Sequence, residues 1–337
     1  MTRSVLTDTV PAGCWQDAFP VGNGRHGGLV AVRPGAGSVI VTHHHLAWPD
    51  SPAPPGPPDL AGRLGRVRDL LLAGESWKAV ELFTGDWPRY HPRPFHPAFA
   101  VLLEDTVLAE DAVPPEEPGP VPAGYRRALH YRTGIAVTRW PGRRHACYVS
   151  RVRDLVVQHV SAARAGGADG AALDVGVGVD PRLPGAPAGL RVSTRVHLPA
   201  PGDALLVTTV WYPRPGTAGY LGVTRVVAGS GGRVTAGRED GVRVAGCREL
   251  TVLSRVEAFD DEAGFAAACG RGLSAVTAGP ADDPRVLAAE HAREHAAAFG
   301  DVRLDLGVPA AERALSAGDL LALQARQPDR PLPSLLE

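Results

Sequence analysis

Between residues 125 and 260, the sequence repeatedly alternates apolar and polar residues in short runs such as LRVSTRVHL and RELTVLSRVEAF. A period of two places successive side chains on opposite faces of a strand, which is typical of half-buried antiparallel sheets. Asp240-Gly241 lies between two such runs and indicates a tight hairpin. Because these runs do not alternate with helices, we exclude a parallel βαβ sheet and predict a mainly β, antiparallel fold.

Residues 13–48 continue this pattern as short apolar runs separated by glycine turns. One of them, FPVGNGRHGGLVAV, contains Gly22-x-Gly24-x-x-Gly27, the spacing of a dinucleotide-binding loop. Such a loop requires a following helix whose N-terminus faces the pyrophosphate. A strand-like run and Pro34 follow instead, so we interpret the glycines as a tight strand–turn–strand corner that needs positive φ and close backbone packing.

Helical periodicity appears in two other places. The spacing of apolar residues over about 59–84 predicts a short inserted helical pair, with Gly74 ending its first helix. After residue 278 the composition changes, and Asp283 followed by Pro284 predicts the start of a helix. We therefore predict a β domain over residues 1–278 and a helical linker tail over 279–337.

Charge and composition exclude several classes of protein. The 35 basic and 36 acidic residues nearly cancel, so neither nucleic acid nor an anionic membrane is an expected partner. No apolar run reaches membrane-spanning length, and the start lacks an apolar signal-peptide core. With no C-x-x-C pair among its four cysteines, the chain is expected to be cytoplasmic, although a mis-assigned start would leave secretion open. No cofactor is expected, because the sequence has no phosphate-binding loop.

The segment His291-Ala-Arg-Glu294-His295 matches the H-x-x-E-H signature of a zinc peptidase. Histidines four residues apart share a helix face, but a catalytic zinc needs a third protein ligand, and the sequence offers no clear one. The alternative is an amphipathic helix with two histidines near one face. We therefore keep a zinc peptidase as a remote alternative and expect no metal site.

Three consecutive histidines, His43-His44-His45, precede Leu46 and Trp48. On a strand, the first and third would share one face while His44 points the other way. We interpret the run as a polar strand end that lines a groove or an interface, with a two-histidine metal site as the less favoured alternative.

Several stretches taken together resemble glycoside hydrolase family 95, the α-L-fucosidase and α-L-galactosidase group. CWQDAFPVGNGRHGGLVAV resembles the opening of that family's N-terminal domain, and RVRDLLLAGESWKAVELF is similar to its helical pair. HAREHAAAFGDVRLDLG resembles the linker that leads out of the β domain. The resemblance implies an antiparallel β-supersandwich with an inserted short helical pair, followed by a helical linker that would lead into an (α/α) barrel absent from this chain.

The chain also departs from the family pattern. His43 and His44 stand where the family usually shows Asn-Glu, and the resemblance ends where the barrel would begin. Family members carry the general acid and the water-activating groups in that barrel, so the resemblance implies no catalytic residue here. Inverting hydrolysis needs two carboxyl groups roughly 6.5–9.5 Å apart, and no such pair is evident in the sequence. We expect this chain alone to be inactive.

The resemblance implies that the β domain packs on the barrel and helps to shape the rim of its site. The residues expected to reach that interface or a carbohydrate are Asn23, Arg25, His26, His44 and Trp48. The alternative is that they only satisfy hydrogen bonds in a buried corner.

The leading hypothesis is a non-catalytic N-terminal domain that supports hydrolysis of α-L-fucosyl or α-L-galactosyl glycosides. Its expected partner is a helical-barrel catalytic domain in cis or in trans. The alternative hypothesis is a free-standing carbohydrate-binding or scaffold protein, with fucosylated glycans as its ligands.

Overall fold

A computed structural model of the chain shows two compact units, Met1–Leu46 with His96–Glu337 and Ala47–Phe95. The residues that the structure describes are 5–47, 60–84, 95–105, 121–162, 172–213, 218–278, 283–299, 321 and 324.

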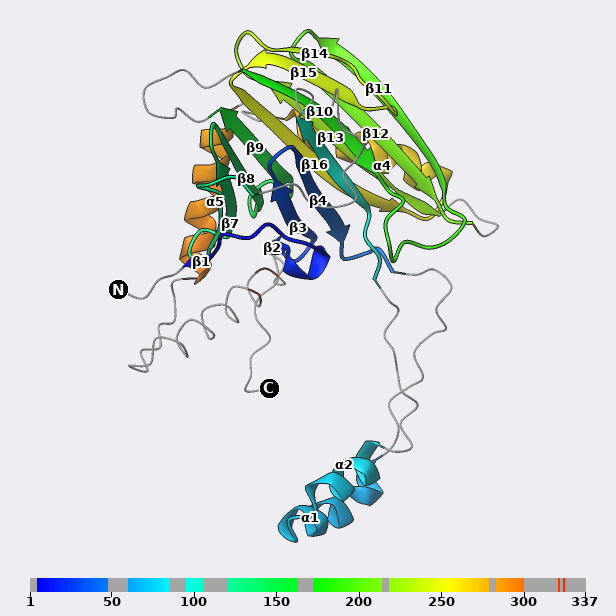
Figure 1. The fold of residues 1–337 in the computed structure, drawn as a ribbon. Coiled ribbons are helices and arrows are strands. Elements are labelled where there is room, and N and C mark those ends of the chain that lie inside the picture. The colour runs from blue at the N-terminus through cyan, green and yellow to red at the C-terminus, as the bar shows by residue number, and fades with distance from the viewer. Residues whose placement is uncertain are drawn as a thin grey trace. The chain divides into compact units, whose positions relative to one another are not determined.

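The larger unit contains two antiparallel sheets (Figure 1). The nine-stranded sheet has the order β1 (Val5–Asp8), β6 (Arg126–His130), β7 (Ile135–Trp140), β8 (Arg143–Val149), β9 (Val156–Ala162), β16 (Glu249–Phe259), β13 (Gly219–Ala228), β12 (Asp203–Trp211) and β11 (Arg191–Ala200). The seven-stranded sheet has the order β14 (Arg233–Ala236), β15 (Val242–Cys247), β10 (Leu173–Asp180), β5 (Phe99–Asp105), β4 (Ala36–His43), β3 (His26–Arg33) and β2 (Phe19–Gly22). The predicted mainly β, antiparallel sandwich is confirmed.

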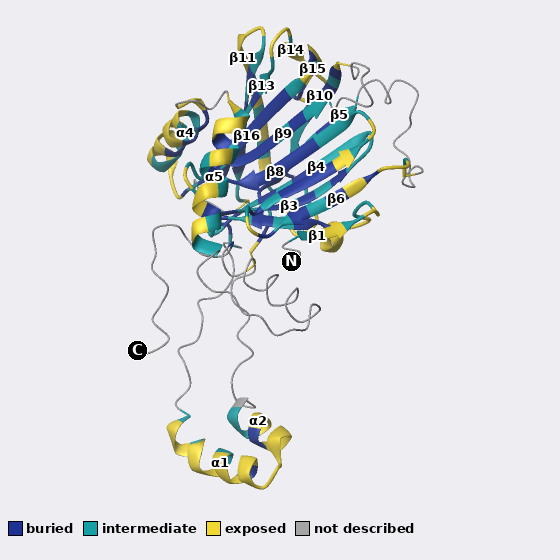
Figure 2. Ribbon diagram, turned by 90° about the vertical axis from the view of Figure 1, so that its left-hand side faces the viewer, coloured by how far each residue is buried: buried dark blue, intermediate teal, exposed yellow. Residues whose placement is uncertain are grey.

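Alternation along the strands creates the core between the two sheets. In β3, Val30 and Val32 are buried while Ala31 between them is only partly buried, as the period-two pattern requires. Buried valines and leucines of both sheets form one continuous cluster, which includes Val39, Val101 and Val256. Burial of this apolar surface is the main force that holds the sheets together, and Figure 2 shows the buried stripes along the strands.

The predicted hairpin between β14 and β15 is confirmed. The backbone N–H of Gly241 donates to the carbonyl oxygen of Arg238 at 2.9 Å, and the two central residues, Glu239 and Asp240, both have positive φ. Positive φ at both central positions is typical of the type I′ turn, whose twist matches that of paired strands.

Two helices pack against the outer face of the nine-stranded sheet. α4 (Glu262–Thr277) and α5 (Pro284–Phe299) bury Val276 and Leu287 against Leu253 and other residues of that sheet. The start of α5 was predicted correctly: the Asp283 carboxylate accepts the backbone N–H of Arg285 at 2.9 Å.

Helix α4 was not predicted from the sequence. Glycines at 264, 270 and 272 obscure its helical pattern, because glycine is a poor helix former. Gly272 has a packing role, since a Cβ there would come within 2.8 Å of Val223 Cγ2. The N-cap is nevertheless regular, and the Asp261 carboxylate accepts the Gly264 N–H at 2.6 Å.

The smaller unit contains the predicted helical pair. It consists of a short 3₁₀ turn, η2 (Ala61–Arg63), then α1 (Leu64–Leu72) and α2 (Ser76–Thr84). Gly74 has a φ of +75° and ends α1 as predicted, while the Glu75 N–H donates to the carbonyl oxygen of Leu70 at 2.8 Å.

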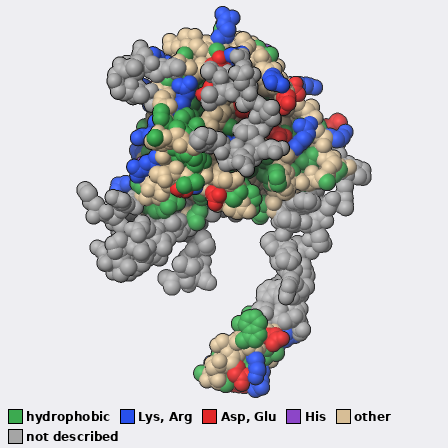
Figure 3. Space-filling model, viewed as in Figure 1, with side chains coloured by type: hydrophobic (Ala, Val, Ile, Leu, Met, Phe, Trp, Pro, Cys, Tyr) green, Lys and Arg blue, Asp and Glu red, His purple; other side chains and the backbone are tan. Residues whose placement is uncertain are grey.

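No helix among the described residues is long and apolar enough to cross a membrane. On the face of the larger unit shown in Figure 3, acidic and basic side chains are interspersed.

The division of the chain into one domain over residues 1–278 and a linker over residues 279–337 remains a prediction. A further 3₁₀ turn, η1 (Trp15–Asp17), precedes β2.

Candidate functional site

The glycine-rich segment forms the corner between β2 and β3. The two strands pair antiparallel, and Gly24 in the connecting turn has a φ of +86°. A Cβ on Gly27 would come within 2.9 Å of Thr42 Cγ2 on the adjacent strand β4. The glycines therefore serve the turn and the packing, and a strand follows where a dinucleotide site requires a helix.

Asn23 lies in this turn and is fully buried. Its Nδ2 donates to the Ser150 carbonyl oxygen at 3.0 Å and to Asp154 Oδ1 at 2.8 Å. Its Oδ1 accepts the backbone N–H groups of Arg25 and His26, each at 2.9 Å. Both ends of the side chain are thus hydrogen-bonded within the protein, and Asn23 ties the corner to the loop between β8 and β9.

His26 is also buried, and it bridges the same loop to β16. Its Nδ1 donates to Asp154 Oδ1 at 2.9 Å, and its Nε2 accepts the Val256 backbone N–H at 3.1 Å. Burial by itself would raise the pKa of Asp154, but the hydrogen bonds from His26 and Asn23 lower that pKa below its usual range. Asp154 therefore stays ionised and anchors the two sheets to each other.

Arginines extend this network across the outer face of the nine-stranded sheet. Arg25 Nη1 lies 3.8 Å from Asp154 Oδ2, and Arg255 Nη1 lies 3.4 Å from the same oxygen. Arg255 also pairs with Glu257 at 2.6 Å, and Glu257 pairs with Arg271 of α4 at 2.9 Å. This chain of ion pairs connects the corner to α4.

Sequence reasoning missed Asp154, Arg255 and Glu257. Asp154 lies in the polar loop SRVRD between two apolar strands, which indicates a turn but not a partner. Its φ of +55° is unusual for a residue other than glycine and is held in place by the hydrogen bonds from the corner.

The histidine run lies at the end of β4, beside the corner. The potential ligand nitrogens of His43, His44 and His45 all lie within 4.8 Å of one another. Imidazole nitrogens suit zinc, copper and nickel, so this group is the metal-binding candidate among the described residues. However, His43 Nδ1 already accepts the His45 backbone N–H at 3.3 Å, and no carboxylate belongs to the group.

Burial differs along the histidine run. His43 is buried, and this burial, with the neighbouring histidines, lowers its pKa to about 2, so it is neutral near pH 7. His44 is half-buried, and its ring stacks on that of the exposed His45 with centroids 3.9 Å apart. Burial, and then the charge of His45, lower the pKa of His44 as well.

The structure brings four of the five predicted site residues together and leaves the fifth outside the described residues. Asn23, Arg25, His26 and His44 adjoin one another at the corner, where the His44 N–H donates to the Arg25 carbonyl oxygen at 2.9 Å. Trp48 lies outside the described residues. Of the four, only Arg25 and His44 have side chains with appreciable exposure.

One residue of the C-terminal tail reaches the same corner. Gln324 is buried, and its Nε2 donates to the Pro20 carbonyl oxygen at 3.1 Å. A Cβ on Gly22 would come within 3.1 Å of the Gln324 carbonyl oxygen, so the glycine permits this approach. Strand β2 therefore contacts a segment 304 residues away in sequence.

The H-x-x-E-H segment forms part of α5. His291 and His295 are buried against the nine-stranded sheet, and His291 stacks on Tyr148 with centroids 4.7 Å apart. Burial lowers the pKa of His291 to about 3 and that of His295 to about 4. Glu294 faces solvent beside Arg293, and among the described residues no third potential ligand joins the two histidines. This geometry does not favour a zinc peptidase.

The corner is chemically suited to positioning rather than to proton transfer. A general acid needs a carboxyl group with a raised pKa. The pKa of Asp154 is instead lowered, and Glu257 is held between two arginines. Within the described part of the corner, no carboxyl group is free to act as an acid.

Residues 6–262 match the family described as glycosyl hydrolase family 65, N-terminal domain. No curated protein matches the chain. The resemblance inferred from the sequence is to glycoside hydrolase family 95, whereas this match names family 65 and does not confirm family 95. The two agree at the level of a glycoside hydrolase N-terminal domain.

Proposed function

Because the chain belongs to the family of glycosyl hydrolase family 65 N-terminal domains, we propose that it is a non-catalytic domain of an α-L-fucosidase-like glycoside hydrolase. It supports hydrolysis of α-L-fucosyl or α-L-galactosyl glycosides by a helical-barrel catalytic domain. The observation that carries this proposal is the match over residues 6–262, which includes nearly all of the sandwich, together with the corner and the helical pair.

The electrostatics of the corner support a non-catalytic role. Glycoside hydrolysis needs one carboxyl group that holds a proton and a second group that activates water or attacks the sugar. The Asp154 carboxylate is instead ionised and enclosed by hydrogen bonds from Asn23 and His26. The acid and base of the reaction must then be supplied by the barrel.

The choice of sugar rests on the resemblance to the α-L-fucosidase group. It depends on the sequence of the corner, CWQDAFPVGNGRHGGLVAV, together with that of the helical pair. Both stretches lie within the matched residues.

The proposed contact with the barrel lies at the exposed rim of the corner. Arg25 and the stacked pair His44 and His45 combine polar groups with flat ring faces, which is typical of surfaces that bind a partner or a sugar. Beneath them, Asn23 and His26 fix the backbone, so the rim is rigid before a partner arrives. The barrel is either part of the same polypeptide or a separate chain.

We place the protein in the cytoplasm, since its four cysteines carry no pattern of a disulfide framework.

An activity assay tests the proposal. The chain is combined with the helical-barrel protein, which is encoded either by a continuation of the same reading frame or by an adjacent gene. Aryl α-L-fucoside, α-L-galactoside and other aryl glycosides are then compared by release of the chromophore. We expect kcat/KM to be highest for one of the first two substrates. Preference for a different glycoside would contradict the proposed specificity, and would leave membership of the family unaffected.

A further inference from the structure

Three arginines lie side by side across three neighbouring strands of the nine-stranded sheet. Arg126 of β6 is the register partner of Arg139 of β7, which in turn is the register partner of Arg144 of β8. Directly opposed residues point to the same face of a sheet, so the three side chains form one row.

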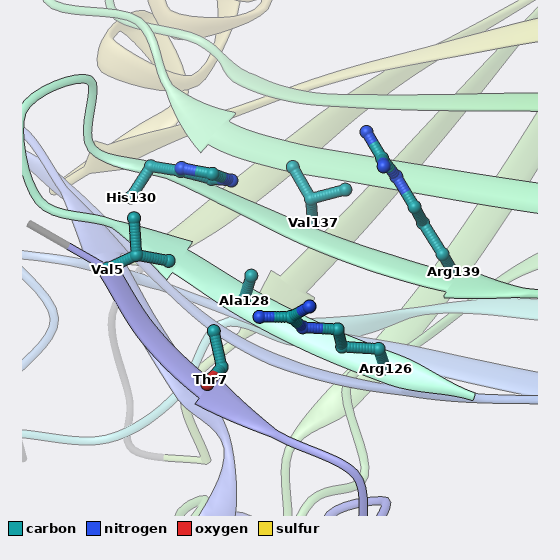
Figure 4. Close-up of a pocket in the computed structure, with 7 residues that line it drawn as sticks. All are labelled: Val5, Thr7, Arg126, Ala128, His130, Val137 and Arg139. Atoms are coloured by element: carbon teal, nitrogen blue, oxygen red, sulfur yellow. The ribbon is translucent and has the colours of Figure 1, made fainter. Parts of the chain in front are cut away.

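This row borders a groove at the β1 edge of the sheet, with a volume of about 550 Å³. Arg126, Arg139 and His130 supply its basic groups, while Val5, Thr7, Ala128 and Val137 supply a largely apolar floor. Figure 4 shows these side chains on the same face of strands β1, β6 and β7. A groove of several hundred Å³ is large enough for a small ligand.

No acidic side chain among the described residues pairs with Arg126, Arg139 or Arg144. Arg127, the next residue on β6, provides the contrast: it points to the opposite face and pairs with Asp8 at 2.5 Å. Burial and then the charges of Arg139, Arg144 and Arg126 lower the pKa of His130, so the positive charge beside the groove comes from the arginines. Burial and Arg139 likewise lower the pKa of Arg144.

Such an arrangement has a cost for folding. Like charges placed directly opposite each other on adjacent strands destabilise a sheet. Three opposed arginines that lack an acidic partner among the described residues form a position where a bound anion would relieve this repulsion. The planar guanidinium group presents paired N–H donors that match the oxygens of a carboxylate or a sulfate.

We propose that the groove formed by Val5, Thr7, Arg126, Ala128, His130, Val137 and Arg139 binds a saccharide that carries an oxyanion, either a sulfate ester or a uronate carboxylate. The arginine row binds the oxyanion, and the apolar floor with the Thr7 hydroxyl receives the C–H face and hydroxyl groups of the sugar ring. The choice of a saccharide rests on the function proposed above, whereas the preference for an anion rests on the arginine row alone.

Isothermal titration of the full chain tests this proposal. The probes are a heparin-derived tetrasaccharide for sulfate, tetragalacturonate for the carboxylate, neutral maltotetraose, and hexaglutamate as an acidic peptide. The test variant is Arg126→Gln/Arg139→Gln. The matched control is Arg191→Gln/Arg195→Gln, which removes the same charge from exposed positions on β11. Thermal unfolding checks that each variant is folded, and a single Arg144→Gln variant provides an independent test of the row.

We expect one or both acidic saccharides to bind at least about tenfold more tightly than maltotetraose, since hydrogen bonds to charged groups contribute roughly that factor. The Arg126→Gln/Arg139→Gln variant should lose at least about tenfold in affinity, and the β11 control less than about twofold. Which saccharide binds identifies the oxyanion. Equal binding of maltotetraose, an unchanged affinity in the test variant, or tighter binding of hexaglutamate would overturn the proposal. Because the titration measures binding alone, its failure is distinguishable from a failure of the hydrolysis assay.

Discussion

Asn23 Nδ2 lies 2.8 Å from Asp154 Oδ1, although 131 residues separate the two in sequence. The contact joins the β2–β3 corner of one sheet to the β8–β9 loop of the other. It explains why an asparagine occupies a fully buried turn position: its amide donates to this carboxylate while its carbonyl accepts two backbone N–H groups.

Replacing Asn23 by alanine should therefore destabilise the protein. The change leaves the buried His26 N–H without its partner and removes the amide hydrogen bonds to Ser150 and Asp154, so we expect a loss of about 2–4 kcal/mol in the free energy of unfolding. Urea denaturation measures this loss. Thr235→Ala on the exposed surface of edge strand β14 is the control and should change stability by less than about 0.5 kcal/mol. A loss in Asn23→Ala no larger than in the control would contradict the role assigned to the amide.

The glycine corner makes a second prediction. Gly27→Ala would bring a Cβ within 2.9 Å of Thr42 Cγ2, and such overpacking costs about 1–3 kcal/mol. Thr42→Ser removes that methyl group and keeps the hydroxyl that donates to the His96 carbonyl oxygen. The double variant should therefore be more stable than the sum of the two single changes predicts, as measured by urea denaturation. Strict additivity would show that the two side chains do not meet.

Buried histidines make stability depend on pH. Burial lowers the pKa of His145 to about 4, whereas the unfolded side chain has the model value of 6.5. The unfolded state therefore binds a proton first as the pH falls, and stability is lost between about pH 6.5 and 4. His145→Gln should reduce the loss between pH 7 and pH 5 by about 2 kcal/mol.

The exposed His197→Gln is the matched control for this pH series. Its unfolding free energy is measured over the same pH range, as the reference for an exposed histidine. An identical pH profile for His145→Gln and the wild type would show that His145 is not the group that titrates.

Metal analysis tests both histidine groups. We expect purified protein to retain less than stoichiometric zinc, copper or nickel, and EDTA to leave Tm unchanged. His43 Nδ1 is occupied by a backbone N–H, and among the described residues His291 and His295 lack a third ligand. One equivalent of metal together with a fall in Tm on chelation would contradict this expectation, and Ala substitutions at His44 and at His291 would then locate the site.

Much of the fold is predictable because local patterns and tertiary burial agree. The strands that become β11 and β16 alternate apolar and polar residues over much of their length, β12 is a run rich in leucine, valine and threonine, and each of the three lies in a sheet. Helix α4 escaped prediction because Gly272 and two further glycines weaken the local signal. Its stability comes from close packing on β13, which no local pattern shows.

The site was predictable only in part. The spacing of the corner drew attention to Asn23, Arg25 and His26, and the structure brings them together. Their shared partner Asp154 is distant in sequence, so only the folded arrangement of the two sheets identifies it. The arginine row was also missed, because strand register decides which of two adjacent arginines, Arg126 or Arg127, faces outward.

The central claim is that this chain is non-catalytic and that a helical barrel carries out the reaction. The most direct test measures hydrolysis of an aryl α-L-fucoside by residues 1–337 alone, and again after the helical-barrel protein is added. The account predicts no turnover above the uncatalysed rate by this chain alone. Addition of this chain should increase the kcat/KM of the barrel, and Asn23→Ala should diminish that increase. Turnover of the fucoside by residues 1–337 alone would contradict the central claim.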